Sequence, residues 1–254
     1  MKITETRSRS LEGFPVLVES ILRSFTRSRR FSTPELPIEP LVGKPTSVVR
    51  SASWGSDSRR SAPVAPNECA LLVLGCQPEI LEVLADHEGL VAEINKVVDI
   101  ARIHEGIVVH ARLAFDPMDY RFPPLTNKEF GTVVQEHQLR NGTPGAGLHP
   151  ALSVRQEDIE LRTTRLGIFS TTKLDEQLTN YGVTTLIVTG CHTSGAVLTT
   201  IREAADRDYR IIVVAGCTAD PDSEVHDFLL ERVLPRQVEI WTAAQLYSSM
   251  AANK

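Results

Sequence analysis

Short apolar runs alternate along the chain with longer stretches in which apolar residues recur at helical spacing. The runs are rich in Val, Ile and Leu, which is typical of strands buried on both faces of a parallel sheet. Strands that alternate with helices predict a three-layer α/β/α sandwich with a mostly parallel central sheet. We expect strands at 70–75, 106–113, 159–163, 184–190, 210–216 and 238–242, and helices at 79–105 (broken near Gly89), 172–181, 197–205 and 224–233.

The stretch from 184 to 220 is the most informative part of this pattern. Its strand, sharp loop, helix and second strand predict a right-handed parallel crossover. The loop GCHTSGA (190–196) follows the carboxyl end of a strand, where open α/β sheets bind their ligands. Residues 114–157 have turn signals and weak periodicity, so we expect a long loop with short helices, which often forms a lid or a pocket wall.

The composition limits the class of protein. The chain has 254 residues, 42% of them apolar, which is enough for a substantial core. No apolar run approaches the roughly 20 residues that span a membrane, and the net charge of −5 gives no general reason to bind nucleic acid. Four cysteines in a chain of this length do not suggest a disulfide framework, so reduced thiols in the cytoplasm are the simpler interpretation.

Charge and composition divide the chain near residue 66. Residues 1–65 carry 11 Lys and Arg against 6 Asp and Glu, whereas the remainder carries 16 against 26. Because the first part is rich in Ser, Arg and Pro, we interpret 1–66 as a largely flexible N-terminal extension and 67–254 as the folded domain. The alternatives are a targeting segment, against which the acidic residues argue, and an arm that packs in an oligomer.

Several stretches in the right order carry a resemblance to a known family. LLVLGCQPEI (71–80) resembles an opening strand of the form LLVIDMQNDF, and LRTTRLGIFSTTKLDEQL (161–178) resembles a K-x-x-x-S-A-F segment with the helix after it. TGCHTSGAVLTT (189–200) resembles a loop of the form TGVATNVCVEST, and the stretch 204–237 also fits. From about residue 69 to about residue 242 the chain resembles the isochorismatase-like (cysteine hydrolase) family.

The resemblance implies hydrolysis of amide, ester or vinyl-ether bonds by an Asp, a Lys and a nucleophilic Cys, with no cofactor. A helix N-terminus and a nearby cation favour the reactive thiolate. In this chain the three positions are occupied by Gly75, Thr163 and Ala196, and the family's non-proline cis peptide falls at Cys191–His192. Loss of a nucleophile and its proton relay typically costs about 10⁴-fold or more in rate, so the family mechanism is not expected to operate.

Three classes of function stay open. The first is an enzyme with a rebuilt site, in which Cys191 is a possible substitute nucleophile. The second is a ligand-binding or regulatory pseudoenzyme, and the third is a partner subunit of an active homologue. The resemblance also implies a homo-oligomer. If the loop geometry is retained, Gly75→Asp, Thr163→Lys and Ala196→Cys together are expected to give measurable thiol acylation.

A small-molecule pocket is expected where the strands end. Cys76, Cys191 and Cys217 each follow the end of a predicted strand, although free cysteines more often act as small apolar fillers. Arg112 and Arg162 are suited to bind a substrate carboxylate, with structural or solvated roles as the alternative. The residues expected to bind substrate are Cys76, Arg112, Arg162, Phe169, Cys191, His192 and Thr193.

No metal site is expected. His110 is followed by Asp116 and Asp119, but this spacing is not that of a metal-binding motif. A hydrogen-bonded histidine at a strand end and solvated acids are the simpler interpretation. His226 is expected on a helix face.

Overall fold

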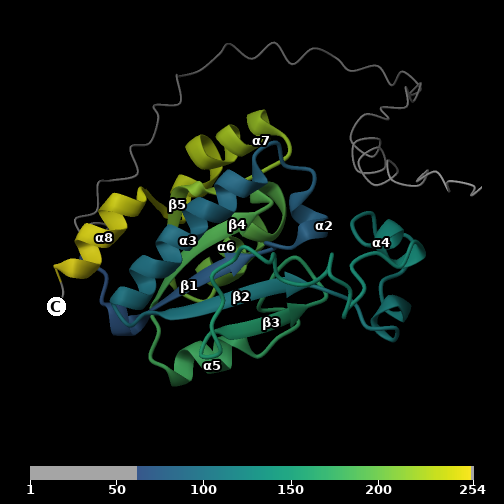
Figure 1. The fold of residues 1–254 in the computed structure, drawn as a ribbon, viewed down its shortest axis with the longest axis horizontal. Coiled ribbons are helices and arrows are strands. Elements are labelled where there is room, and N and C mark those ends of the chain that lie inside the picture. The colour runs from purple at the N-terminus through teal and green to yellow at the C-terminus, as the bar shows by residue number, and fades with distance from the viewer. Residues whose placement is uncertain (1–61, 253–254) are drawn as a thin grey trace, which may run out of the picture. The chain divides into compact units, whose positions relative to one another are not determined.

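The computed structural model describes residues 62–252, so most of the expected extension lies outside the described residues. The described chain contains a six-stranded sheet in which all neighbouring strands are parallel, in the order β3-β2-β1-β4-β5-β6 (Figure 1). The predicted fold class is therefore confirmed. The strands are β1 (Cys69–Leu74), β2 (Ile107–Leu113), β3 (Ile159–Thr163), β4 (Thr185–Cys191), β5 (Arg210–Ala219) and β6 (Glu239–Trp241).

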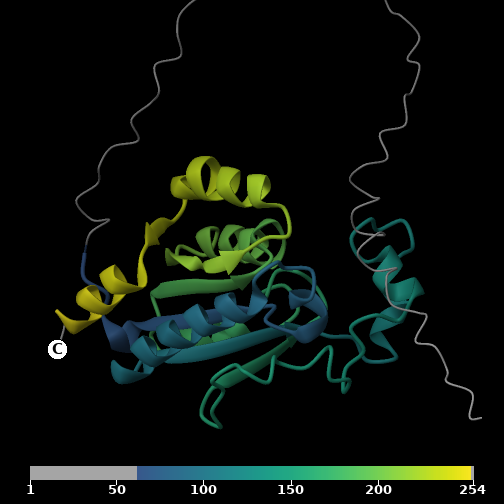
Figure 2. The ribbon, with the colours of Figure 1, turned by 45° about the horizontal axis from the view of Figure 1, so that its top comes forward.

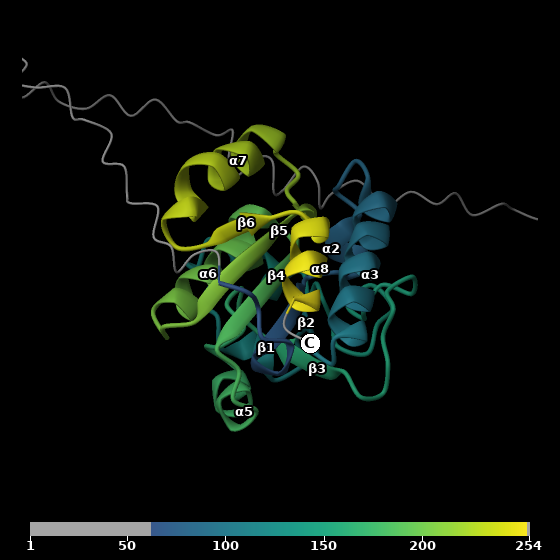
Figure 3. The ribbon, with the colours of Figure 1, turned by 90° about the vertical axis from the view of Figure 1, so that its left-hand side faces the viewer.

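Helices cover both faces of the sheet, as Figure 3 shows. Alternate residues of a strand point to opposite faces, so Leu71 packs among residues of α3 and α8, and Leu72 packs among residues of α5 and α6. None of the described helices is long and apolar enough to cross a membrane. The helices are α2 (Pro78–Leu81), α3 (His87–Ile103), α4 (Gly131–Gln135), α5 (Leu174–Asn180), α6 (Leu198–Ala205), α7 (Ser223–Phe228) and α8 (Ala243–Ala251).

Two helices differ from the expected pattern. The helix expected at 79–105 is divided into α2 and α3, and the break falls before Gly89 rather than at it. The reason is that Asp86 caps α3: its carboxylate accepts a hydrogen bond of 2.9 Å from the Gly89 N–H, and a side chain at position 89 would overlap that carboxylate. The apolar pattern gives no sign of α8, which begins with a capping box between Thr242 and Gln245.

The long segment between β2 and β3 has little regular structure, as expected. In Figures 1 and 2, α4 and its neighbours lie to one side of the sheet. The segment has its own small apolar cluster, in which the ring of Phe115 lies 5.4 Å from that of Tyr120 and 6.0 Å from that of Phe130. This cluster lets a segment without long helices keep a defined shape.

Side chains of α3 hold the last part of that segment before it enters β3. Asn95 donates to and accepts from the segment's backbone, with both hydrogen bonds at 2.8 Å. Arg102 donates to Ser153 Oγ at 2.7 Å and to Asp158 Oδ2 at 2.6 Å, and these arginine and aspartate side chains are only 9% and 4% exposed. His110 Nε2 donates to the same carboxylate at 3.2 Å, and burial lowers the pKa of this histidine. A buried ion pair therefore joins α3 to the entrance of β3.

We expect this ion pair to contribute strongly to stability. Asp158→Asn leaves the buried Arg102 charge uncompensated and is expected to lower the free energy of unfolding by about 3 kcal/mol. Glu93→Gln is the matched control, because Glu93 pairs with Lys96 on the exposed face of the same helix and its loss costs about 0.5 kcal/mol or less. Urea unfolding measures both values, and equal effects of the two variants would contradict the assignment.

Candidate functional site

The direction of strand addition reverses between β1 and β4, since β2 and β3 lie on one side of β1 and β4 lies on the other. Open α/β sheets bind ligands beyond the carboxyl ends of the strands at such a point. Leu74 pairs with Gly190, so the next residues, Gly75 and Cys191, lie side by side. We call this region, with the loop after β4, the switch-point edge. The expected cis peptide bond between Cys191 and His192 is present there.

Gly75 has a backbone conformation that favours glycine, with φ at +63°. Its N–H donates to the Ala111 carbonyl oxygen at 2.9 Å, and a Cβ at this position would overlap the carbonyl oxygen of Cys191. The position expected for the catalytic acid therefore has no room for a side chain. This overlap argues against the expectation that Gly75→Asp takes part in restoring thiol acylation, because the aspartate fits only if the backbone moves.

The other two positions of the expected catalytic set also lie at the carboxyl edge of the sheet. Thr163 is the last residue of β3 and is buried, and its hydroxyl donates to the Arg165 carbonyl oxygen at 3.0 Å. Ala196 lies in η4 (Thr193–Val197), the short π-helical turn before α6, and its half-buried methyl group packs against the apolar layer under α5 and α6. Neither residue carries a charge or a thiol.

Two side-chain hydrogen bonds hold the loop after β4 in place. His192 Nε2 donates to the carbonyl oxygen of Ile80 in α2 at 3.1 Å. The buried hydroxyl of Thr193 lies 2.8 Å from Nδ1 of His226 in α7. The sequence places His226 on a helix face but gives no sign of this contact, because the two residues are far apart in the chain. His192 and Thr193 thus brace the loop rather than project from it.

The cysteine thiols are buried on the α3 side of the sheet. Cys191 Sγ donates to the Gly75 carbonyl oxygen at 3.4 Å, and hydrogen bonding with Cys76 together with burial raises the pKa of the Cys191 thiol. Burial raises the pKa of Cys217 to about 12. A buried thiol with a raised pKa is a poor nucleophile. Burial and the raised pKa both argue against Cys191 as a substitute nucleophile, and Cys76 and Cys191 fill space in the core.

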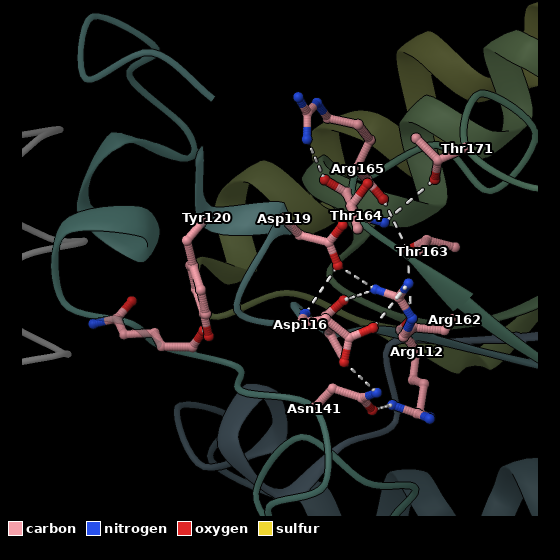
Figure 4. A network of polar contacts seen from close by, with 12 residues as sticks. Arg112, Asp116, Asp119, Tyr120, Asn141, Arg162, Thr163, Thr164, Arg165 and Thr171 are labelled. Carbon is pink, nitrogen blue, oxygen red and sulfur yellow. Dashed lines mark hydrogen bonds and ion pairs between the residues drawn. The ribbon is translucent and has the colours of Figure 1, made fainter. Parts of the chain in front are cut away.

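The two candidate carboxylate-binding arginines are already paired within the protein (Figure 4). Arg162 donates to Asp119 at 2.6 Å and lies 3.3 Å from a carboxylate oxygen of Asp116. Arg112 donates to Glu160 at 2.6 Å and to Asn141 at 2.8 Å. These contacts support the structural alternative, because they attach the long segment to the ends of β2 and β3. Arg112 and Glu160 also line an open groove of about 630 Å³ that contains none of Gly75, Thr163 and Ala196.

Phe169 does not lie at the switch-point edge. Its ring stacks on Tyr209 at 6.0 Å, and the guanidinium carbon of Arg207 lies 4.9 Å from the ring centre. Tyr209 precedes β5, so this cluster is at the amino end of that strand. This position argues against the expectation that Phe169 binds substrate, because the chain turns back along the sheet after β3.

Two other side chains lie shortly after the ends of strands, Gln77 after β1 and Arg165 after β3. Gln77 is fully buried and its side-chain amide forms hydrogen bonds of 2.6 and 2.9 Å with the backbone of Leu113. The Gln shared by the stretch LLVLGCQPEI and the family form LLVIDMQNDF is a signal that points to it. Arg165 is half-buried, and its guanidinium carbon lies 5.2 Å from the ring centre of Phe130. No signal in the sequence separates Arg165 from the nearby paired arginines.

Comparisons with known proteins agree on one family. Residues 69–245 match the family model described as Isochorismatase domain. The uncharacterized isochorismatase family protein YwoC of Bacillus subtilis (strain 168) is 27% identical over 168 residues, which cover 66% of this chain and 86% of the relative. A maleamate amidohydrolase of Pseudomonas putida is 25% identical over 142 residues, 55% of this chain and 65% of the relative. The solved structure of a cysteine hydrolase from Pseudomonas syringae pv. phaseolicola 1448A shares the fold, with a TM-score of 0.68 and 22% identity over 76% of this chain and 96% of that chain.

The contact between Gly75 and Cys191 predicts the effect of adding one methyl group. Gly75→Ala combines a left-handed φ with overlap of backbone atoms and is expected to lower the free energy of unfolding by about 3 kcal/mol. Gly182→Ala is the control, because Gly182 has a φ of +71° and open space around it, so only about 1 kcal/mol is expected from the conformation. Chemical denaturation distinguishes the two, and similar losses would show that the overlap is not the cause.

The burial of the thiols predicts their reactivity. All four cysteines are buried, so the native protein is expected to react with an aromatic disulfide reagent at less than one thiol per chain, and the denatured protein at four. The absorbance of the released thiolate gives both counts. Rapid reaction of Cys191 in the native protein, identified by peptide mass, would contradict its burial.

Proposed function

The chain belongs to the isochorismatase family, and from this premise we propose that it binds a small molecule at the switch-point edge without the covalent cysteine chemistry that the resemblance implies. In this proposal the hydrolase fold is retained as a binding scaffold. The Asp, Lys and Cys of the family correspond to Gly75, Thr163 and Ala196 in this chain.

The main support is that the described residues, which include all four cysteines, offer no accessible thiol at the edge. Ala196 has no side-chain nucleophile, and Cys191 is buried with a raised pKa. A proton relay at position 75 is also blocked, since no side chain fits there. An acyl-enzyme mechanism needs an accessible thiolate and a group that moves its proton, and both are missing.

The edge nevertheless keeps features suited to binding. The loop after β4 is braced from α2 and α7, while Ser194 is exposed and Gly195 and Ala196 are only half-buried. A rigid loop with partly open backbone is a common basis for a ligand site. Hydrolysis through a rebuilt site is the alternative. The Pseudomonas putida relative is named for hydrolysis of maleamate, so small amides are the first molecules to offer.

The experiment offers maleamate to the full chain and measures both binding and turnover. We expect a saturable rise in melting temperature without release of ammonia above the buffer rate, since binding to the native state alone stabilises it. The maleamate amidohydrolase relative serves as the positive control for turnover. Ammonia release catalysed by this protein would overturn the proposal.

The Ala196→Cys variant tests whether the ligand binds at the switch-point edge. Because the native thiols are buried and position 196 is only half-buried, this variant adds one partly accessible thiol at the edge. A ligand bound at the edge is expected to slow alkylation of that thiol by iodoacetamide. Ser248→Cys is the control, because Ser248 is exposed on α8 and its alkylation is expected to be unaffected. Equal rates with and without ligand in the Ala196→Cys variant would place the binding elsewhere.

A further inference from the structure

Arg165 differs from its neighbours in having no acidic partner among the described residues. Arg112 and Arg162 each form ion pairs with carboxylates. The Arg165 side chain has no carboxylate oxygen within 4.0 Å in that part of the chain, and its only side-chain hydrogen bond there goes to the Thr164 carbonyl oxygen at 2.6 Å. A guanidinium has five N–H donors, so most of those of Arg165 are free to bind.

The ring of Phe130 holds this guanidinium in place. The guanidinium carbon lies 5.2 Å from the ring centre, which is within the range of a cation–π contact. Figure 4 shows the side chain extending away from Asp116 and Asp119, toward neither of the carboxylates that hold Arg162. An arginine fixed by an aromatic ring loses less conformational entropy when it binds an anion than a freely moving one.

Apolar contacts connect Arg165 to the switch-point edge. A Cβ at Gly195 would lie 4.0 Å from a methyl group of Leu166, the residue after Arg165. A Cβ at Gly75 would lie 3.9 Å from a methyl group of Ile80. Ile80, Leu113 and Leu166 are all half-buried and pack against the cluster that contains Phe130. Partly exposed apolar side chains that pack on the same cluster as the Phe130 ring therefore lie close to Gly75 and Gly195 at the ends of β1 and β4.

Three acidic groups near the edge are already engaged. Asp116 and Asp119 hold Arg162, and Asp220 accepts a hydrogen bond of 2.7 Å from the Ser194 N–H. A half-buried cation without a protein partner gains most from an anion that reaches it from solution, because partial burial strengthens the pairing.

Building on the proposed function, we infer that Arg165 binds the carboxylate of a small molecule whose short apolar body lies on Ile80, Leu113 and Leu166. The guanidinium offers parallel N–H donors to the two carboxylate oxygens, which is the geometry that arginine provides and lysine does not. These apolar side chains exclude water from one side of the pair. The ligand class of the switch-point edge is therefore a small carboxylate rather than a neutral amide.

Benzoate and benzamide form a matched pair of probes for this inference, since they share a ring and differ in charge. Titration calorimetry on the full chain is expected to show tighter binding of benzoate. Arg165→Gln is expected to weaken benzoate binding by about 10- to 100-fold, the usual effect of losing a charged hydrogen-bonding partner, and Arg165→Lys by an intermediate amount. The Arg165 Nε–H signal in an NMR spectrum, assigned by its loss in Arg165→Gln, is expected to shift with benzoate.

Arg207→Gln is the matched control, because Arg207 makes the same kind of contact with Phe169 away from the edge. It is expected to leave benzoate binding within about twofold. The inference is overturned if benzoate does not bind, if benzamide binds equally well, or if Arg165→Gln binds benzoate as the unmodified chain does. Hydrolysis of benzamide, by contrast, would overturn the proposed function, so the two failures are distinguishable.

Discussion

The close approach of two backbone segments at the ends of β1 and β4 sets the character of the site. Gly75 lies directly against the carbonyl group of Cys191, and only a residue without a side chain fits between them. The same approach lets the Cys191 thiol donate to the Gly75 carbonyl oxygen, which turns it toward the α3 side of the sheet. One steric contact thus excludes an acid at position 75 and keeps the nearest thiol away from solvent.

Irregular parts of the chain depend on buried polar side chains rather than on helices of their own. Gln77 binds the backbone of Leu113, and Asn95 and Arg102 on α3 bind the stretch that leads to β3. Backbone groups that leave a sheet or helix need such partners when they are buried. The long segment between β2 and β3 therefore has a fixed path, although few of its residues belong to regular elements.

The central strands β1 and β4 were predictable because they are buried along their whole length and so appear as nearly unbroken apolar runs. Contacts between distant residues were not. The pairing of Arg162 with Asp119 depends on how the chain folds back after β2, and the contact of Thr193 with His226 joins η4 to α7. Periodicity reports which face of an element is apolar, but not which polar groups meet across elements. The positions of the catalytic set followed from the resemblance, whereas the lack of space at Gly75 needed coordinates.

In the proposed function, the residues expected at positions 75, 163 and 196 are physically coupled. A carboxylate at position 75 would need room, and a reactive thiol at position 196 would need that carboxylate to move its proton. Once the backbone at Gly75 closes against Cys191, a cysteine at 196 or a lysine at 163 loses its function in the family mechanism. A buried lysine without a partner at position 163 would lower the stability of the fold. Thr163 avoids this loss, because its hydroxyl group donates a hydrogen bond to the backbone. The positive charge that such a site uses to attract an anion lies instead on Arg165, where the ring of Phe130 supports it outside the core.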